Sequence, residues 1–304
     1  MENSTQVKLF YLFGLQETFN NKSVYFTLSL ITYLLIITVN LTLIITIIQQ
    51  KGLHEPMYIF LCSLCVNGLY GTAGFYPKFL LDLQSDVQGI SYGGCLTQTY
   101  VIYTSVMCEM STLTVMSYDR YVAICRPLLY HTIYNNIMTL NRVCILICVI
   151  WLYSFAKSIK TLTLTIRLGL CVNVIDKVYC DNYLVVKLAC STSDTTVNKI
   201  YGLCGIVLSV PVPLITIVLS YIKILTICLN SSIETRQKAF STCSPHLASL
   251  LNFSFGCFLT LLQSRFDSPM RNVPTVLHTF LSVYYLMLLY KLLLLLFNLK
   301  KKVN

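Results

Sequence analysis

Seven apolar stretches dominate this chain, and each is close to the length of a helix that crosses a lipid bilayer, about 20 residues. In a bilayer every backbone N–H and C=O group must be bonded within the protein, so such stretches form helices. The pattern predicts an all-α membrane protein, a seven-transmembrane helix bundle that forms a single domain over residues 1–304. The expected spans are residues 24–48, 57–81, 96–124, 143–166, 200–229, 246–262 and 273–297.

The composition excludes an ordinary soluble domain. Hydrophobic residues make up 56% of the chain and charged residues 11%, and the mean hydropathy is +0.69, far above that of soluble proteins. A net charge of +10 does not indicate a nucleic-acid binder, because the basic residues are spread among short loops. The N-terminus lacks the basic region of a cleaved signal peptide, so we expect the first span to be its own targeting signal.

The distribution of Lys and Arg favours an extracellular N-terminus. With that orientation the inner loops and tail hold ten basic residues and the outer segments eleven, so the raw count decides nothing. Six of the eleven lie in residues 157–199, expected to be the longest loop, and charge in long loops has little influence on orientation. Without that loop the count is ten to five. Residues 1–23 are then extracellular, and residues 298–304 form a short cytoplasmic tail.

Two glycosylation triplets lie in the N-terminal segment, beginning at Asn3 and Asn21. They are on the side of the membrane where glycosylation takes place. Such triplets are common by chance, since Asn40, Asn230 and Asn252 begin others in places that no glycosyltransferase reaches.

Four cysteines lie in polar connecting segments, whereas many others lie in apolar runs. An oxidising compartment on the outer side would let a cysteine at the outer end of the third helix form a disulfide with a loop cysteine. The spacing does not identify the partner. The four are Cys95, Cys171, Cys180 and Cys190.

Charged residues end the third span, in the sequence MSYDRYVAIC at residues 116–125. The apolar run before them contains one charged residue, Glu109, so Arg120 is expected where the helix meets water. Asp119 and Arg120 are adjacent and point partly apart on a helix, which leaves the arginine available to a neighbouring helix or a partner. They are a candidate switch; the plain alternative is a flanking charge that ends the span.

This sequence resembles MAYDRYVAIC, a signature of odorant receptors, a branch of the rhodopsin-like G-protein-coupled receptors. Four further segments resemble signatures of that family in the same order, and the resemblance extends over about residues 7–285. Residues 66–80, VNGLYGTAGFYPKFL, look most like fish-type odorant receptors. The four segments are KGLHEPMYIFL at 51–61, RPLLYHTIYN at 126–135, Ser220 with Tyr221, and KAFSTCSPHL at 238–247.

The resemblance implies a plasma-membrane receptor with no enzymatic activity and no cofactor or metal. A small odorant would bind within the bundle, the sixth helix would swing outward, and a stimulatory heterotrimeric G protein would raise cyclic AMP; lipid is the remaining partner, and nucleic acid is not one. It also implies disulfides from Cys95 to Cys180 and from Cys171 to Cys190. The implied coupling surface consists of Asp119, Arg120, Tyr121, Tyr221 and Lys238.

Apolar residues at helical spacing on the third span predict one wall of the odorant pocket. Apolar residues at such spacing usually pack in the core of a protein. Here, similar positions line the odorant pocket in the family that this sequence resembles, and this similarity favours ligand binding. The lining is apolar with few donors and suits a small hydrophobic ligand, which the hydroxyls of Tyr103 and Ser209 could orient. The stripe is Ile102, Tyr103, Val106, Met107 and Met110, with Gly205, Ile206 and Ser209 on the fifth span and Phe255, Phe258 and Leu262 on the sixth.

Two features depart from the family pattern. Glu109 matches a glutamate that resembles a cation or proton site shared with an aspartate on the second helix, but Gly68 stands at the aspartate position, next to Asn67. We therefore expect a protonated Glu109 or weak cation binding. In the seventh span the family's asparagine, proline and tyrosine are replaced, and Lys291 lies nearby, so restoring the three residues is expected to raise signalling. The replacements are Leu293, Leu294 and Phe297.

Two other classes of function remain open. A peptide or amine receptor is one, although an amine site usually needs an aspartate where Ile102 and Tyr103 stand. A transporter or membrane enzyme is the other, although the sequence contains no HExxH or GxSxG motif and no evident inverted repeat.

Overall fold

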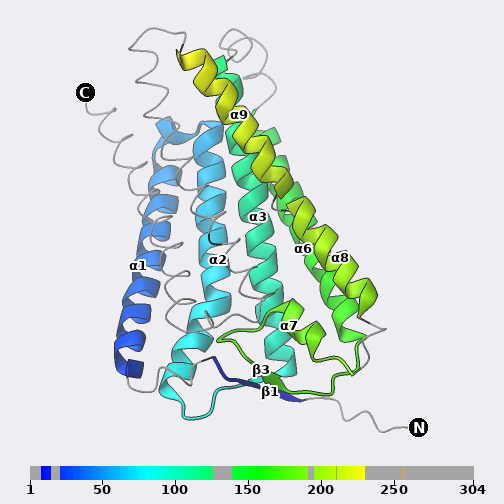
Figure 1. Ribbon diagram of the computed structural model, residues 1–304. Helices are drawn as coiled ribbons and strands as arrows, with labels where there is room; N and C mark the ends of the chain where they lie inside the picture. Colours follow the sequence, from blue (N-terminus) through cyan, green and yellow to red (C-terminus); the bar gives the residue numbers. More distant parts are fainter. Residues whose placement is uncertain are drawn as a thin grey trace.

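In the computed structural model, residues 8–14, 21–125, 139–190, 195–209, 211–229 and 256 are described. Long helices lie side by side across the whole height of the molecule (Figure 1). The first five expected spans correspond to them within a few residues, the fifth to α8 and α9 together. Apart from Gly256, the sixth and seventh spans lie outside the described residues. The helices are α1 (Lys22–Gln49), α2 (Pro56–Gln84), α3 (Tyr92–Cys125), α6 (Leu140–Ile166), α8 (Thr196–Ser209) and α9 (Pro211–Leu229).

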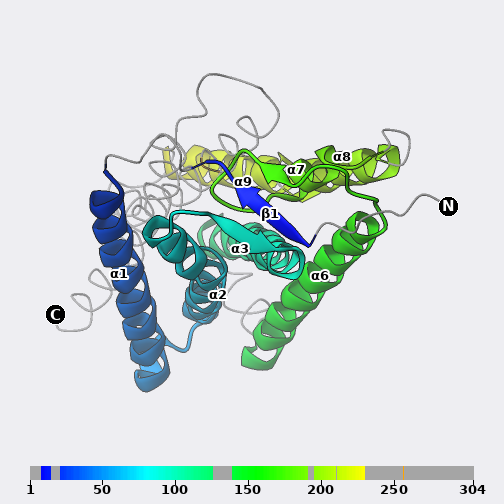
Figure 2. The same ribbon diagram turned by 90° about the horizontal axis from the view of Figure 1, so that it is seen from below.

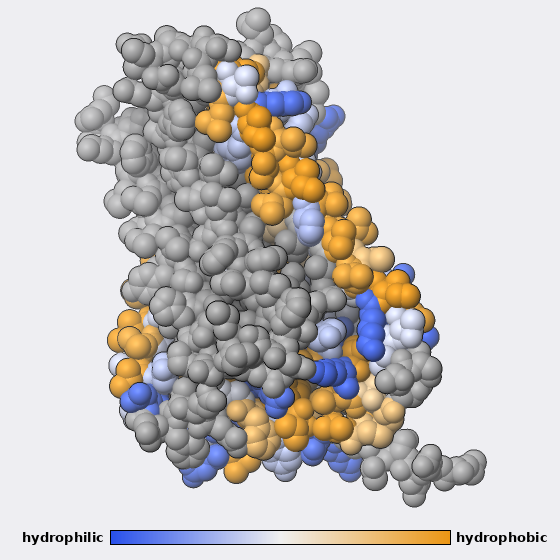
Figure 3. Space-filling model, in the orientation of Figure 1, coloured by the Kyte–Doolittle hydropathy of each residue, from blue (hydrophilic) through white to orange (hydrophobic). Residues whose placement is uncertain are grey.

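Within the described chain, α1, α2, α6 and the run Thr196–Ile227 are each long and apolar enough to cross a membrane. Their outward side chains are apolar, and Figure 3 shows such side chains as a band along α8 and α9. In a bilayer these side chains face lipid, which requires no polar partner. Exposed examples are Leu28, Ile31, Leu152, Leu208, Ile215 and Leu219.

Helix α3, which was expected to span the membrane over residues 96–124, is less apolar than these four helical segments. It lies at the centre of the bundle, in contact with α2, α6, α8 and α9, and can therefore carry more polar residues. Three of its buried polar side chains bond to neighbouring helices, Gln98 to Gly74 and Glu109 to Asn67 of α2 and Thr104 to Ser158 of α6, and lipid cannot supply such partners. The buried polar residues of α3 are Gln98, Thr99, Thr104, Glu109, Thr112, Ser117 and Asp119.

Where α3 begins, a small sheet and a short helix cover the end of the bundle. Strand β1 (Leu9–Leu12) lies between β2 (Gly89–Ser91), to which it is antiparallel, and β3 (Val174–Ile175), to which it is parallel. Figure 2 looks onto this end and shows β1 crossing over α3. We call these strands, with α7 (Asn182–Lys187) and their connections, the lid. The sheet was not expected from the sequence.

The lid and the inner half of the bundle have separate hydrophobic clusters. Under the lid, Phe10 and Ile175 pack against Cys95 and Cys180. At the opposite end, α2, α3, α6 and α9 meet in a second cluster. The buried members of the second cluster are Met57, Phe60, Leu64, Leu113, Met116, Val143, Ile217, Tyr221 and Ile224.

The structure confirms the expected span at 143–166, because α6 continues to Ile166 and contains both Lys157 and Lys160. Counting these two lysines with the long loop, as in the comparison of basic residues, was wrong. An α-helix already bonds its own backbone, so two lysines do not end it when their side chains find polar or aromatic partners.

Candidate functional site

One disulfide attaches the lid to α3, and a second joins two residues within the loop that forms the lid. Cys95, in the first turn of α3, is bonded to Cys180, and Cys171 is bonded to Cys190, with Cα atoms 5.4 Å and 4.9 Å apart. These are the pairs that the family resemblance implies. Because disulfides form in an oxidising compartment, the lid end is the extracellular end. Strand β1 lies at this end, so the N-terminal segment is extracellular too.

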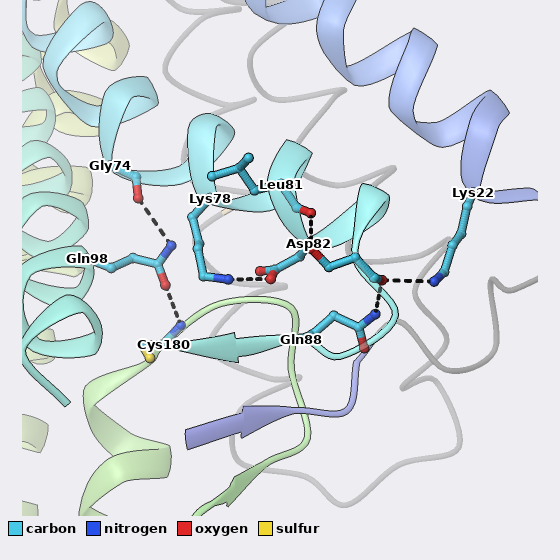
Figure 4. Close-up of polar contacts among 9 residues, drawn as sticks. Lys22, Gly74, Lys78, Leu81, Asp82, Gln88, Gln98 and Cys180 are labelled. Atoms are coloured by element: carbon cyan, nitrogen blue, oxygen red, sulfur yellow. Dashed lines mark hydrogen bonds and ion pairs between the residues drawn. The ribbon is translucent and has the colours of Figure 1, made fainter. Parts of the chain in front are cut away.

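A glutamine connects the lid to two helices. Gln98 in α3 accepts a hydrogen bond from the backbone N–H of Cys180 at 2.8 Å and donates one to the carbonyl of Gly74 in α2 at 3.2 Å (Figure 4). Both polar groups of its amide are therefore used. The contact holds the disulfide-bonded part of the loop against the outer ends of α2 and α3.

Charged side chains join the outer ends of α1 and α2, also in Figure 4. Lys78 forms an ion pair with Asp82 one turn later in α2. Lys22, at the start of α1, and Gln88 both donate to the carbonyl of Ser85, each at 3.1 Å. These bonds satisfy a carbonyl at the end of α2 and fix the turn that leads to β2.

Asp181 is the main polar node of the lid. Its carboxylate accepts hydrogen bonds from the Tyr103 hydroxyl at 3.0 Å and from the backbone N–H of Tyr183 at 3.2 Å, and it pairs with Lys177 across 3.3 Å. The Tyr183 contact caps α7. Asp181 was not predicted as a site residue, because an acidic residue at the start of a helix in a long loop is common.

The predicted stripe on α3 divides between the lid and the interior. Ile102 packs against the buried aromatic cluster of α2, and the Tyr103 hydroxyl is bonded to the lid. Val106 is partly exposed, while Met107 and Met110 are buried. In the described part of the chain, Tyr103 is therefore an anchor of the lid, and Met110, 1% exposed, is a core residue.

The predicted residues of α8 face a lysine. The Lys157 ammonium donates to the carbonyl of Gly205 at 3.2 Å and to the hydroxyl of Ser209. The side chain of Ile206, and Phe255, Phe258 and Leu262, lie outside the described residues. Lys157 was not predicted as a site residue, because it was counted among the charges of the long loop. Its position four residues after Tyr153, in an otherwise apolar span, was the available signal.

Glu109 meets α2 through Asn67. The Asn67 side-chain amide donates to Glu109 Oε2 at 2.7 Å and to the carbonyl of Ser105 at 3.0 Å. The residue opposite the glutamate is thus Asn67, and not Gly68. An amide in place of a second carboxylate supplies two N–H donors and one neutral oxygen, so this pair has at most one negative charge.

At the inner end of α3, Asp119 and Arg120 form an ion pair, with Arg120 Nε 2.9 Å from Asp119 Oδ2. This corrects the expectation that adjacency would keep them apart: the long arginine side chain folds back to a carboxylate that is 0% exposed. Nearby, Lys223 of α9 lies 5.7 Å from the ring centre of Tyr121. Tyr221 is buried in the inner cluster, and Lys238 lies outside the described residues.

The remaining predictions concern the N-terminal segment and the seventh span. Asn21 is exposed and precedes the first turn of α1, whereas Asn3 lies outside the described residues. Residues 291–297 also lie outside them. Among the described residues no group of three or more His, Cys, Asp or Glu side chains is placed to hold a metal ion.

Comparison with known proteins identifies the family. The profile described as "Olfactory receptor" matches residues 28–303. Olfactory receptor 1E16 of Mus musculus is 37% identical over 93% of this chain and 87% of its own length, and olfactory receptor 6C1 of Homo sapiens is 38% identical over 84% and 80%. Squid rhodopsin, at 16% identity, has the same fold with a TM-score of 0.67 over 90% of this chain and 81% of that one. This multi-pass plasma-membrane protein, a seven-transmembrane receptor without enzymatic activity, belongs to the olfactory receptor family.

Proposed function

We propose that this receptor binds a small odorant in the outer half of its helix bundle and activates a stimulatory heterotrimeric G protein, which raises cyclic AMP. The observation that carries the proposal is the course of α3. That helix begins under the lid at the Cys95 disulfide and ends in the Asp119–Arg120 ion pair. A single helix thus connects the side that odorants reach with the side that faces the cytoplasm.

The proposed ligand site lies below the lid, between α3, α8 and the sixth span. Its α3 wall is next to the lid contact of Tyr103, so a bound odorant and the lid would influence each other through that helix. Glu109, almost two helix turns farther in than Tyr103, is the proposed proton-binding or weak cation site. The proposed ligand-binding residues are Ile102, Tyr103, Val106, Met107, Gly205, Ile206, Ser209, Phe255, Phe258 and Leu262.

The proposed coupling surface lies at the inner ends of α3 and α9. In the described structure Arg120 is held by Asp119, while Tyr221 contributes to the inner core. An outward movement of neighbouring helices would release the arginine toward the G-protein α subunit. The proposed coupling residues are Asp119, Arg120, Tyr121, Tyr221 and Lys238, and Asn3 and Asn21 are the proposed glycosylation sites.

A cyclic AMP reporter in cells that express the receptor tests the proposal. We expect odorants from a water-soluble panel to raise cyclic AMP, and Arg120→Ala to abolish the rise. Arg142→Ala is the matched control, because this exposed arginine lies at the inner start of α6 and forms no ion pair in the described residues. Surface labelling is used to show that the wild type, Arg120→Ala and Arg142→Ala reach the cell surface in equal amounts. A full response of Arg120→Ala would contradict the coupling mechanism.

A further inference from the structure

The seam between α6 and α8 holds two cations in the membrane-spanning part of the bundle. The Lys157 ammonium donates to Gly205 and Ser209 and lies 5.8 Å from the centre of the Tyr153 ring. Lys160, almost one turn farther out, lies 5.3 Å from the centre of the Tyr201 ring. Lysine is rare inside membranes and is usually functional there.

Among the described residues of α6, α8 and α9, no carboxylate balances the charge of Lys157. Helices α6, α8 and α9 contain no Asp or Glu. The ion pairs of the described residues involve Lys78, Arg120 and Lys177. Neutral oxygens solvate an ammonium only in part, and in a medium of low dielectric constant the remaining charge strongly favours an anion.

The direction of the side chain argues against a lipid head group as that anion. Gly205 and Ser209 follow Thr196, the first residue of α8, by 9 and 13 residues. At 1.5 Å per residue they lie roughly 14 Å and 20 Å along the helix. A snorkelling lysine extends toward the nearer head groups, but the Lys157 ammonium points toward the middle of a hydrocarbon layer about 30 Å thick.

Lys157 also borders the interior of the bundle. The neighbouring Ser158 accepts a hydrogen bond from Thr104 of α3 at 2.9 Å, so that side of α6 faces α3. The lipid-facing side of α6 carries Leu152 and Ile159, 67% and 55% exposed. Lys157 lies between the α3-facing side and α8, on the same helix seam as two predicted ligand-binding residues, Gly205 and Ser209.

We propose that Lys157 binds the carboxylate of an acidic odorant, a small organic anion with an apolar body, and that the Ser209 hydroxyl donates a second hydrogen bond to it. The inference rests on the proposed function and names the ligand class of the same site. A carboxylate offers about four acceptor positions and accepts from both donors at once. Binding replaces the neutral carbonyl of Gly205 with a charged acceptor, and charge-assisted hydrogen bonds are about twice as strong as neutral ones.

Direct binding tests this without requiring a signal. The full-length receptor is purified in phosphatidylcholine nanodiscs, and its thermal unfolding is followed with unbranched carboxylates from butanoate to decanoate and with the matched alcohols. For at least one chain length we expect the carboxylate to bind about tenfold or more tightly than the alcohol, which corresponds to about 1.4 kcal/mol. Lys157→Gln should abolish this preference, since glutamine keeps a hydrogen-bond donor and loses the charge.

Lys160→Gln is the matched control, because it removes a cation from the same seam almost one turn away, and it should retain the preference. Ser209→Ala is a second, milder variant and should reduce the preference several-fold. Equal binding of acids and alcohols at every chain length, or an unchanged preference in Lys157→Gln, would overturn the proposal. So would loss of the preference in Lys160→Gln alone, which would place the anion farther out.

A lipid arm separates the two sources of an anion. Replacing part of the phosphatidylcholine with phosphatidylglycerol should leave the difference in stability between wild type and Lys157→Gln unchanged. Stabilisation by phosphatidylglycerol that requires Lys157 would assign the lysine to lipid and overturn the proposal. If the receptor binds carboxylates and no odorant raises cyclic AMP, the proposed signalling fails while the ligand class stands. If alcohols but not acids raise cyclic AMP, the proposed signalling stands and the ligand class fails.

Discussion

The Tyr103 hydroxyl of α3 donates a hydrogen bond to Oδ1 of Asp181 in the lid, across 3.0 Å. The same carboxylate caps α7 and pairs with Lys177. One acidic residue therefore joins three parts of the extracellular end: the third helix, the short helix and the strand connection. Its loss should loosen the lid far more than the loss of any single partner.

We expect Asp181→Ala to lower the midpoint of thermal unfolding more than Tyr103→Phe. The tyrosine change removes one hydrogen bond, which contributes about 0.5 to 1.5 kcal/mol. The aspartate change also removes a helix cap, which contributes about 1 kcal/mol, and takes the carboxylate away from the buried Lys177 ammonium. The two purified variants are compared in the same detergent. Equal midpoints would show that the carboxylate acts only through Tyr103.

The two disulfides should differ in their contribution to stability. Cys95 and Cys180 are separated by 85 residues, and Cys171 and Cys190 by 19. In the chain-entropy model the longer loop gives the larger stabilisation, by about 1.3 kcal/mol. The double variant Cys95→Ser with Cys180→Ser should therefore unfold at a lower temperature than the double variant of the other pair. The reverse order would mean that the shorter loop does more to hold the folded lid.

The length of the apolar runs was sufficient to predict the helices that face lipid. Residues 24–48 and 57–81 were expected, and the structure has Lys22–Gln49 and Pro56–Gln84. A bilayer leaves a long apolar run no alternative to a helix, so the prediction depends on little else. The ends are longer than expected because polar residues such as Lys22 and Gln84 continue the helices beyond the apolar runs.

Contacts between distant segments were not predictable in the same way. Strand β1 has four residues and pairs with segments about 80 and 160 residues away in the sequence, a contact that no local pattern indicates. The partner of Lys157 depends on how α6 is rotated against α8, and periodicity in one helix does not determine that rotation. The disulfide pairs were available only through the family resemblance, since four cysteines allow three pairings.

The contact between Asn67 and Glu109 predicts a coupled pair. Asn67→Leu removes the donor of a 2.7 Å hydrogen bond to a buried carboxyl group, which should destabilise the receptor by about 1 to 3 kcal/mol. Glu109→Leu in the same chain removes the acid as well, so the double variant should be less destabilised than the sum of the single variants, by about 0.5 to 3 kcal/mol. Thermal unfolding of the four proteins gives the coupling. Additive effects would mean that the two residues act independently.

Neutralising Asp119 should raise signalling in the absence of odorant. Its Oδ2 lies 2.9 Å from Arg120 Nε, and the carboxylate is 0% exposed, so solvent screens the pair little. Asp119→Asn keeps an acceptor and removes the charge, which weakens the hold on Arg120. If the inactive state loses about 1 to 2 kcal/mol of stabilisation, the ratio of active to inactive receptor rises roughly 5- to 30-fold.

Basal cyclic AMP at matched surface expression measures that shift. Adding Arg120→Ala to Asp119→Asn should return basal cyclic AMP to the level of cells without receptor, because the released arginine is the proposed contact with the G protein. Arg142→Ala in place of Arg120→Ala is the control and should leave the raised level intact. A basal level that Asp119→Asn does not change would mean that the Asp119–Arg120 pair contributes to folding and takes no part in holding the receptor inactive.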